Sequence, residues 1–379
     1  METGTCSHYP AHTTTRPVAA LGHDFTGAWI HDDTHHWKEC ARTPGVISGN
    51  GVEESAKALH SFVGGVCSIC ERTQDLPTVV ITVPSLDHPT LADAIAAVPP
   101  GATATIRLEE DIIIPSAIAV DGKEITIVSQ SGTTTISLGE NGNMFAVGSG
   151  GTLRLGDEDT TNTLTLQGRD DNTNSLIRVT SGGTLEMNDS AVITGNVLPS
   201  STGAGVHVNG GVFNMNGGKI TDCKAGSDGG AVRIISGTAT ISGSSEISGN
   251  TGNYGGAIAM GNGILTIEGD VTIHSNTVTV SGGAISVNGT AGIVNMMGGS
   301  IYNNTANGGG GGGVFMQAGT FNFYGGIIYG TDGETHSLPR APNTATTNSA
   351  ALLRSGGTAQ YGDGVAIPTS NETITGRMP

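Results

Sequence analysis

The sequence predicts an all-β protein, a right-handed parallel β-helix with three short strands and about 26–28 residues per coil. Two observations predict this class. Glycine supplies 61 of the 379 residues and recurs at fixed intervals, with β-branched residues between the glycines. Within each repeat apolar and polar residues alternate, a period of two that is typical of strands. Helical repeats of similar length are excluded, because so much glycine would destabilise them.

A short cap is expected before the solenoid. Residues 79–83 predict a strand, and residues 90–98 predict an amphipathic helix with Thr90 as its N-cap and Pro99-Pro100 as its stop. We expect the apolar face of this helix to cover the first coil, formed by residues 112–114, 118–120 and 125–128. That face comprises Leu91, Ala94, Ile95 and Val98.

Two motifs of each coil predict its first and second strands. The first is Gly-Gly-Ala-Ile, at 255–258 and 282–285, with variants at 229–232 and 311–314. The second is an alternating strand such as Thr-Leu-Glu-Met at 184–187, whose second and fourth residues are expected to point inward. These residues form two columns, Leu153, Leu185, Phe213, Ala239, Leu265, Val294 and Phe321, and Leu155, Met187, Met215, Ile241, Ile267, Met296 and Phe323.

A third motif, Ile-x-x-Asn, predicts the third strand and a ladder of side-chain amides. Its isoleucines are Ile193, Ile220, Ile247, Ile273 and Ile301, followed three residues later by Asn196, Cys223, Asn250, Asn276 and Asn304. Stacked asparagines can bond to one another and to turn backbone. We interpret Cys223 as a small buried thiol that fills an asparagine position.

We expect four segments along the chain. Residues 1–76 form a small Cys/His-rich module, 77–100 the strand and capping helix, 101–330 the parallel β-helix, and 331–379 a loop and an irregular last coil. Roughly nine or ten coils would extend about 45 Å at a strand spacing of about 4.8 Å. An incompletely capped last coil would leave end-to-end self-association open as a hypothesis.

Composition and charge exclude several functions. The formal net charge is −17, with only 16 basic residues that form no cluster along the sequence, so nucleic acid is not an expected partner. Apolar runs stay short of 18 residues, so no transmembrane segment is expected. The sequence starts Met1-Glu2-Thr3-Gly4, which lacks the basic start and apolar stretch of a leader peptide.

The Gly-Gly-Ala-Ile and Ile-x-x-Asn pairing resembles the repeats of chlamydial polymorphic membrane proteins, and the layout of residues 78–376 is similar to β-helix surface proteins of spirochaetes and anaerobic bacteria. The resemblance implies an extracellular or cell-surface protein that acts as an adhesin, stalk or structural repeat protein. Its implied partner is a host or matrix surface, glycan or protein. The chain differs by having Ile where the chlamydial repeats have Phe and by lacking their C-terminal autotransporter barrel, so we do not expect it to anchor itself in an outer membrane.

The N-terminal module predicts a structural zinc site. A Cys-x-x-Cys pair with another cysteine and nearby histidines fits tetrahedral zinc, which takes thiolate and imidazole ligands. The predicted ligands are Cys40, Cys67 and Cys70 with either His36 or His60, and His23 is a further candidate. A Cys67–Cys70 disulfide and free thiols are the alternatives. The module resembles His-Trp-x-x-Cys repeats of bacterial surface proteins, although Thr43 stands where the partner of Cys40 would be.

A carbohydrate-active enzyme, either a polysaccharide lyase or a glycoside hydrolase, is the alternative function, since many parallel β-helices act on polysaccharides. Glycoside hydrolysis needs two carboxylates at one cleft. Asp222 and Asp228 are the nearest pair in the central coils, and we interpret them as solvated turn residues. Because the outward positions are mostly Thr, Asn, Ser and Gly, we expect no catalytic site.

Two further groups could bind ions. His207 and Arg233, with Arg178, would form a small basic patch on the first strand. The acidic loops at 156–162 and 169–174 are rich in oxygen ligands, so calcium is a further candidate, with ordinary solvated loops as the alternative.

Overall fold

The computed structural model describes residues 79–330, 340–346, 351–370 and 373–375, together with the backbone of five short strands before residue 68. The chain divides into two compact units, Met1–Asp75 and Leu76–Pro379. In the described backbone of the first unit, β1 (Ile30–His31), β2 (His35–Trp37) and β3 (Ala58–Leu59) form an antiparallel sheet, and β4 (Phe62–Val63) pairs with β5 (Val66–Cys67).

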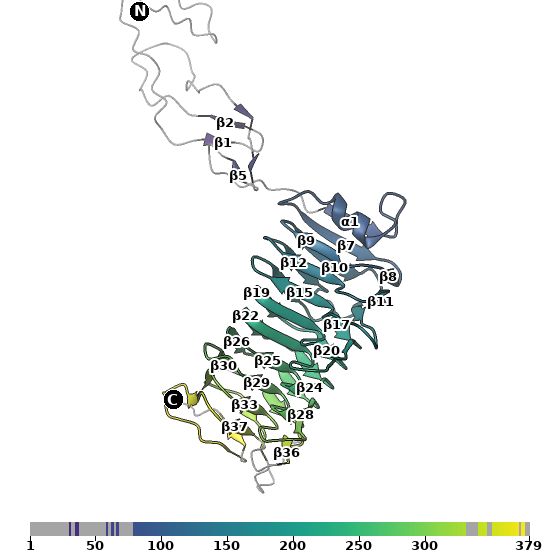
Figure 1. The fold of residues 1–379 in the computed structure, drawn as a ribbon. Helices are drawn as coiled ribbons and strands as arrows, with labels where there is room; N and C mark the ends of the chain where they lie inside the picture. Colours follow the sequence, from purple (N-terminus) through teal and green to yellow (C-terminus); the bar gives the residue numbers. More distant parts are fainter. Residues whose placement is uncertain are drawn as a thin grey trace, which may run out of the picture. The chain divides into compact units, whose positions relative to one another are not determined.

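The second unit is a stack of parallel coils, which confirms the predicted parallel β-helix (Figure 1). Strands at equivalent positions of successive coils pair in parallel register and form the faces of the solenoid. We name these the first, second and third faces after the three predicted strands. A fourth, shorter ladder was not predicted, because most of its strands are too brief to show a sequence period.

The first face comprises β9 (Ile118–Asp121), β12 (Phe145–Gly148), β15 (Ile177–Thr180), the starts of β19 (Val206–Met215) and β22 (Val232–Ile241), β25 (Ile258–Met260), β29 (Ile285–Val287), β33 (Val314–Met316) and β37 (Leu352–Arg354). The second face comprises β6 (Val79–Val83), β7 (Thr103–Leu108), β10 (Glu124–Ser129), β13 (Thr152–Leu155), β16 (Thr184–Met187), the ends of β19 and β22, β26 (Ile264–Ile267), β30 (Ile293–Met296), β34 (Thr320–Phe323) and β38 (Thr358–Tyr361).

The third face comprises β8 (Ile112–Ile114), β11 (Thr133–Leu138), β14 (Thr163–Gln167), β17 (Ala191–Thr194), β20 (Lys219–Thr221), β23 (Glu246–Ser248), β27 (Thr272–His274), β31 (Ser300–Tyr302), β35 (Ile327–Ile328) and β39 (Ile374–Thr375). The fourth ladder comprises β18 (Val197–Leu198), β21 (Lys224–Ala225), β24 (Thr251–Tyr254), β28 (Thr277–Ser281), β32 (Thr305–Ala306) and β36 (Thr344–Ala345).

The core follows the predicted columns of the second face. All the residues assigned to the two inward columns are buried, from Leu153 and Leu155 to Phe321 and Phe323. The outward residues between them are partly exposed, as the alternation predicts. Each coil therefore buries its apolar side chains inside the solenoid, against its neighbouring coils.

The Gly-Gly-Ala-Ile motif begins its strand later than predicted. Gly255 and Gly256 lie in the turn, and β25 starts at Ile258. Gly255 has φ +61°, which favours glycine, and a Cβ there would lie 2.2 Å from the carbonyl oxygen of Ile258. A Cβ on Gly256 would lie 2.5 Å from the carbonyl oxygen of Gly283, in the next copy of the motif. Gly255 is thus required by the turn of its own coil, and Gly256 is required because adjacent coils stack backbone against backbone at this corner.

The predicted cap is confirmed. Helix α1 (Leu91–Ala97) begins after Thr90, whose hydroxyl accepts a 3.1 Å hydrogen bond from the backbone N–H of Asp93. Its apolar face, Leu91, Ala94, Ile95 and Val98, is buried in the common core. Strand β7 precedes the three strands predicted as the first coil and pairs with β6 and β10, so the solenoid begins one strand earlier than expected.

A ladder of buried amides runs along the corner after the third face, as predicted. Nδ2 of Asn250 donates to Oδ1 of Asn276 at 3.0 Å, and Nδ2 of Asn276 donates to Oδ1 of Asn304 at 2.9 Å. The ladder also includes Asn172 and Asn343, which were not predicted. Cys223 takes one position, is fully buried, and donates its backbone N–H to Oδ1 of Asn250.

The last coils are covered by the chain's own end. The segment before β39 runs antiparallel to the edge strands, with bridges from Leu352 to Ser370 and from Gln360 to Ala366. β39 itself pairs antiparallel with β35. The segment 331–379, predicted as a loop and an irregular last coil, includes β36, which extends the fourth ladder. The antiparallel pairing of the C-terminal segment covers strand edges of the last coils that end-to-end association would need. The association itself stays a prediction.

Candidate functional site

Three basic side chains, two arginines and a histidine, stack on the outward side of the first face. The parallel register pairs Arg178 of β15 with His207 of β19, and His207 with Arg233 of β22. The three residues therefore occupy one outward position in three successive coils, about 4.8 Å apart per coil. This is the basic patch expected from the sequence, and we call it the basic column.

Arg233 is the most enclosed member of the basic column. Its side chain is 11% exposed, and its Cβ lies against the backbone of Gly203 in the preceding coil. Nη1 lies 3.7 Å from Oδ2 of Asp228, which is close enough for an ion pair but too long for a hydrogen bond. Nε and Nη1 are buried and have no hydrogen-bond partner among the described residues. Burial lowers the pKa of Arg233, and Asp228 opposes that effect.

His207 lies between the two arginines. Burial is the main cause that lowers its pKa below the usual value for histidine, and the charges of Arg178 and Arg233 lower it further. Arg178 is exposed. The free column therefore carries two guanidinium charges and an imidazole that is held neutral near pH 7.

Small and aromatic residues continue the same outward row beyond Arg233. The register runs from Arg233 through Ala259 and Ser286 to Phe315. The Tyr254 ring stacks on Phe315, with centroids 6.1 Å apart. Tyr254 belongs to the coil of Ala259, so this contact crosses the coil of Ser286. The contact explains why Ser286, although outward, is only 2% exposed.

A second polar row, on the third face, was missed by sequence reasoning. Oε1 of Glu246 lies 3.3 Å from Nε2 of His274, and Oε2 lies 2.9 Å from Nζ of Lys219. The His274 ring stacks on Tyr302, and the guanidinium of Arg340 lies 4.5 Å from the centroid of the Tyr302 ring. Hydrogen bonds from Lys219 and Ser248 lower the pKa of Glu246 against the opposing effect of burial. Only the stacking of coils brings these residues together.

Asp222 and Asp228, the carboxylates considered as a catalytic pair, lie in different turns. They lie at opposite ends of β21, and Oδ2 of Asp228 faces Arg233. Asp222 adopts φ +54° in the turn after β20. The interpretation of both as turn residues agrees with this arrangement.

The acidic loops bind their own backbone. Asp157 accepts hydrogen bonds from the Ser190 hydroxyl and the N–H of Asp159, and Asp159 accepts one from the N–H of Thr161. Hydrogen bonds from the side chain and the backbone N–H of Thr161 lower the pKa of Asp159. In the second loop Asn172 is buried in the amide ladder. Within the described part of the chain, no three His, Cys, Asp or Glu side chains gather as a metal site, and calcium stays a prediction.

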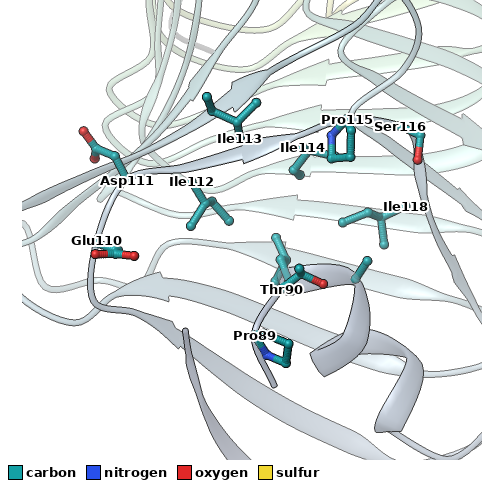
Figure 2. Close-up of a pocket in the computed structure, with 12 residues that line it drawn as sticks. Pro89, Thr90, Glu110, Asp111, Ile112, Ile113, Ile114, Pro115, Ser116 and Ile118 are labelled. Atoms are coloured by element: carbon teal, nitrogen blue, oxygen red, sulfur yellow. The ribbon is translucent and has the colours of Figure 1, made fainter. Parts of the chain in front are cut away.

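A cavity of about 330 Å³ lies where the cap meets the first coils (Figure 2). Isoleucines 112, 114 and 118 line it opposite the start of α1, and Glu110 and Asp111 stand at its edge (Figure 2). Asp111 accepts a 2.7 Å hydrogen bond from the backbone N–H of Thr135, so its carboxylate already stabilises the adjacent coil.

The predicted zinc ligands lie outside the residues whose side chains are described. His23, Cys40, His60 and Cys70 fall outside the described residues altogether, and only the backbone is described for His36 in β2 and Cys67 in β5. The zinc site, its alternatives and its ligand set therefore stay predictions.

Comparison with family models, curated proteins and solved structures finds no match for this chain. Among the described residues, no helix is both long and apolar enough to span a membrane. The fold and the side chains of the solenoid are thus the basis for any functional proposal.

Proposed function

We propose that this chain is a non-enzymatic extracellular or cell-surface protein, whose β-helix serves as an adhesin, stalk or structural repeat protein. One observation carries the proposal: from Asn214 to Gln360, the outward column of the second face holds uncharged polar side chains in register over successive coils. Asn322 donates to Asn295 at 2.9 Å, and Gln360 donates to Asn322 at 3.0 Å. Such a surface presents many equivalent hydrogen-bonding groups and no group activated for chemistry.

The repeat motifs support the same role. Gly-Gly-Ala-Ile and Ile-x-x-Asn are similar to the repeats of chlamydial polymorphic membrane proteins, and the layout is similar to that of spirochaete and anaerobe surface proteins. The expected partner is a glycan or protein of a host or matrix surface. We further propose that the N-terminal module holds a structural zinc ion through the predicted cysteine and histidine ligands, because a module this small needs a cross-link to fold.

A carbohydrate-active enzyme is the second candidate. One observation favours it: Glu246 and His274 lie within hydrogen-bond reach on a surface that also carries Tyr302. A carboxylate beside an imidazole is a recurring acid–base arrangement. However, Lys219 also pairs with Glu246, which keeps that carboxyl ionised and unsuited to donate a proton.

One experiment separates the two candidates. The full chain is incubated with a panel of immobilised neutral and acidic polysaccharides and matrix proteins. Bound protein is measured, and the soluble oligosaccharides of the same panel are then analysed by mass spectrometry. The proposal expects saturable binding to at least one member, with all oligosaccharide masses unchanged. Cleavage of any oligosaccharide, or binding to no member of the panel, would contradict it.

A further inference from the structure

We propose that the basic column binds a carboxylate or sulfate group carried by an acidic glycan. The inference rests on the proposed binding function and names the class of ligand. It follows from the unpaired donors of Arg233, from the charge balance of the column, and from the row of residues beside it.

The first argument is the unsatisfied guanidinium of Arg233. Buried donors are nearly always hydrogen-bonded, because an unpaired donor loses the hydrogen bonds that water would make to it, and a charged donor loses more. Nε and Nη1 of Arg233 have no partner in the described chain, and Asp228 stays beyond hydrogen-bond distance. A small rotation of the side chain would turn its planar fork of donors toward an anion at the surface, where it could bind two oxygens at once.

The second argument is the charge balance of the column compared with that of other cations. Arg154 on the second face bonds Glu124 at 3.0 Å and Glu186 at 2.7 Å, so two carboxylates neutralise it. The basic column has two arginines and one histidine, and among the described residues the only carboxylate paired with it is that of Asp228 at 3.7 Å. In a chain of net charge −17, this local excess of positive charge is conspicuous. Charges farther away than about 8–10 Å are screened at physiological salt, so the local excess decides what binds.

The third argument is the surface beside the cations. Ala259 and Ser286 follow Arg233 along the row, and the stacked Tyr254 and Phe315 rings lie beside and beyond them. Ala259 and Ser286 are almost fully buried, so a ligand would contact the cations and the partly exposed Tyr254 of the next coil, which offers both an apolar ring and a hydroxyl. A sugar polymer with occasional acidic groups fits this combination. Nucleic acid fits less well, because its closely spaced phosphates require a longer basic stripe.

The fold does not require the cations. In the same outward row the coil before Arg178 carries Ala146, and the coil after Arg233 carries Ala259. Alanine is therefore a native occupant of the position. We infer that the cations serve a ligand, and that Arg178→Ala and His207→Ala preserve the solenoid. For Arg233, Arg233→Met retains the aliphatic stem that packs on Gly203.

The test measures binding of the full chain to hyaluronan, chondroitin sulfate, dextran and duplex DNA by titration calorimetry. We expect binding to one or both acidic glycans, competition by inorganic sulfate, and at least a tenfold weaker affinity for Arg178→Ala and for Arg233→Met. Lys224→Ala removes an exposed cation on β21 and is the matched control, with affinity unchanged within twofold. Circular dichroism melts verify that each variant is folded.

Several outcomes would overturn the site. The first is an equal loss of glycan affinity in Lys224→Ala and Arg178→Ala. The second is DNA binding as tight as glycan binding, and the third is no binding to either acidic glycan. If dextran or a panel protein is bound and the variants leave that binding unchanged, the site fails while the proposed function stands. Cleavage of a glycan contradicts the proposed function itself.

Discussion

Nδ2 of Asn250 donates a hydrogen bond to Oδ1 of Asn276, one coil further along, across 3.0 Å. The same oxygen accepts the backbone N–H of Asn250, also at 3.0 Å. Each asparagine thus satisfies a buried backbone donor of the preceding coil as well as its side-chain amide. The ladder fixes the register of the coils at a corner where no regular strand pairing does so.

Asn276→Ala is expected to destabilise the protein by about 3 kcal/mol, because the buried N–H of Asn250 loses its acceptor and a cavity opens. The measurement is urea unfolding followed by circular dichroism. Asn214→Ala, in a partly exposed outward position of β19, is the control and should change stability by less than about 0.5 kcal/mol. Equal losses of stability in the two variants would contradict a stabilising role for the asparagine ladder.

The thiol of Cys223 is expected to be unreactive in the native protein. Burial is the main cause that raises its pKa to about 12, so little thiolate forms up to about pH 9. Iodoacetamide labelling followed by peptide mass spectrometry should find Cys223 unmodified in the native chain and modified in urea. Rapid native labelling at this cysteine would contradict its burial.

Gly256→Ala is expected to destabilise the solenoid by about 3 kcal/mol, since its Cβ would lie 2.5 Å from the carbonyl oxygen of Gly283. Gly132→Ala is the comparison, because Gly132 has φ +63° but an open surrounding, and it should cost only about 1–2 kcal/mol. Thermal melts of the two variants measure the difference. A larger loss of stability in Gly132→Ala than in Gly256→Ala would mean that the backbone around Gly256 can shift to accommodate a Cβ.

Binding of an acidic ligand is expected to strengthen as the pH falls from about 7.5 to about 5.5, the range in which histidines titrate. Burial lowers the pKa of His207 in the free protein, and the charges of Arg178 and Arg233 lower it further. The nearby carboxylate of Asp228 is paired with Arg233. A bound anion favours the protonated imidazole, so binding takes up a proton.

The lowered pKa of His207 also affects the stability of the free protein. As the pH falls below about 6.5, the pKa of a histidine in the unfolded chain, the unfolded state binds more protons and the folded state loses stability.

Titration calorimetry at several pH values measures the linkage between ligand binding and proton uptake by His207. His207→Gln should lose it, whereas His274→Gln, which changes the other described histidine with a lowered pKa, should keep it. A pH dependence that survives in His207→Gln would exclude this histidine as its source.

The N-terminal module is expected to bring zinc with the purified protein, at about one ion per chain. Mass spectrometric metal analysis measures the content. The double variant Cys67→Ser and Cys70→Ser should lose it, and Cys223→Ser should retain it. Zinc-free protein purified without chelators would contradict the proposed site and favour the disulfide or free thiols.

Most of the solenoid could be predicted because each coil repeats one alternating strand. The inward positions of Leu185 and Met187 follow from that period alone. The start of β25 at Ile258 could not be predicted, because the local turn requires Gly255 and contact with the next coil requires Gly256, and neither constraint shows in the strand period. β36 and Asn343 were missed, because they follow a long insertion that disrupts the repeat interval.

Side-chain surroundings were less predictable than the strands. The outward slot of Arg233 suggests exposure, yet the backbone of Gly203 in the preceding coil covers its stem. The pairing of Tyr254 with Phe315 crosses a whole coil, so it leaves no local pattern in the sequence. The basic column itself was predictable, because its three residues share one position of the repeat.

The most direct test of the central claim is a titration of the full chain with chondroitin sulfate, followed by mass analysis of the recovered glycan. The account predicts saturable binding that Arg178→Ala weakens at least tenfold, and a glycan of unchanged length. A shortened glycan, or binding that Arg178→Ala leaves unaltered, would contradict it.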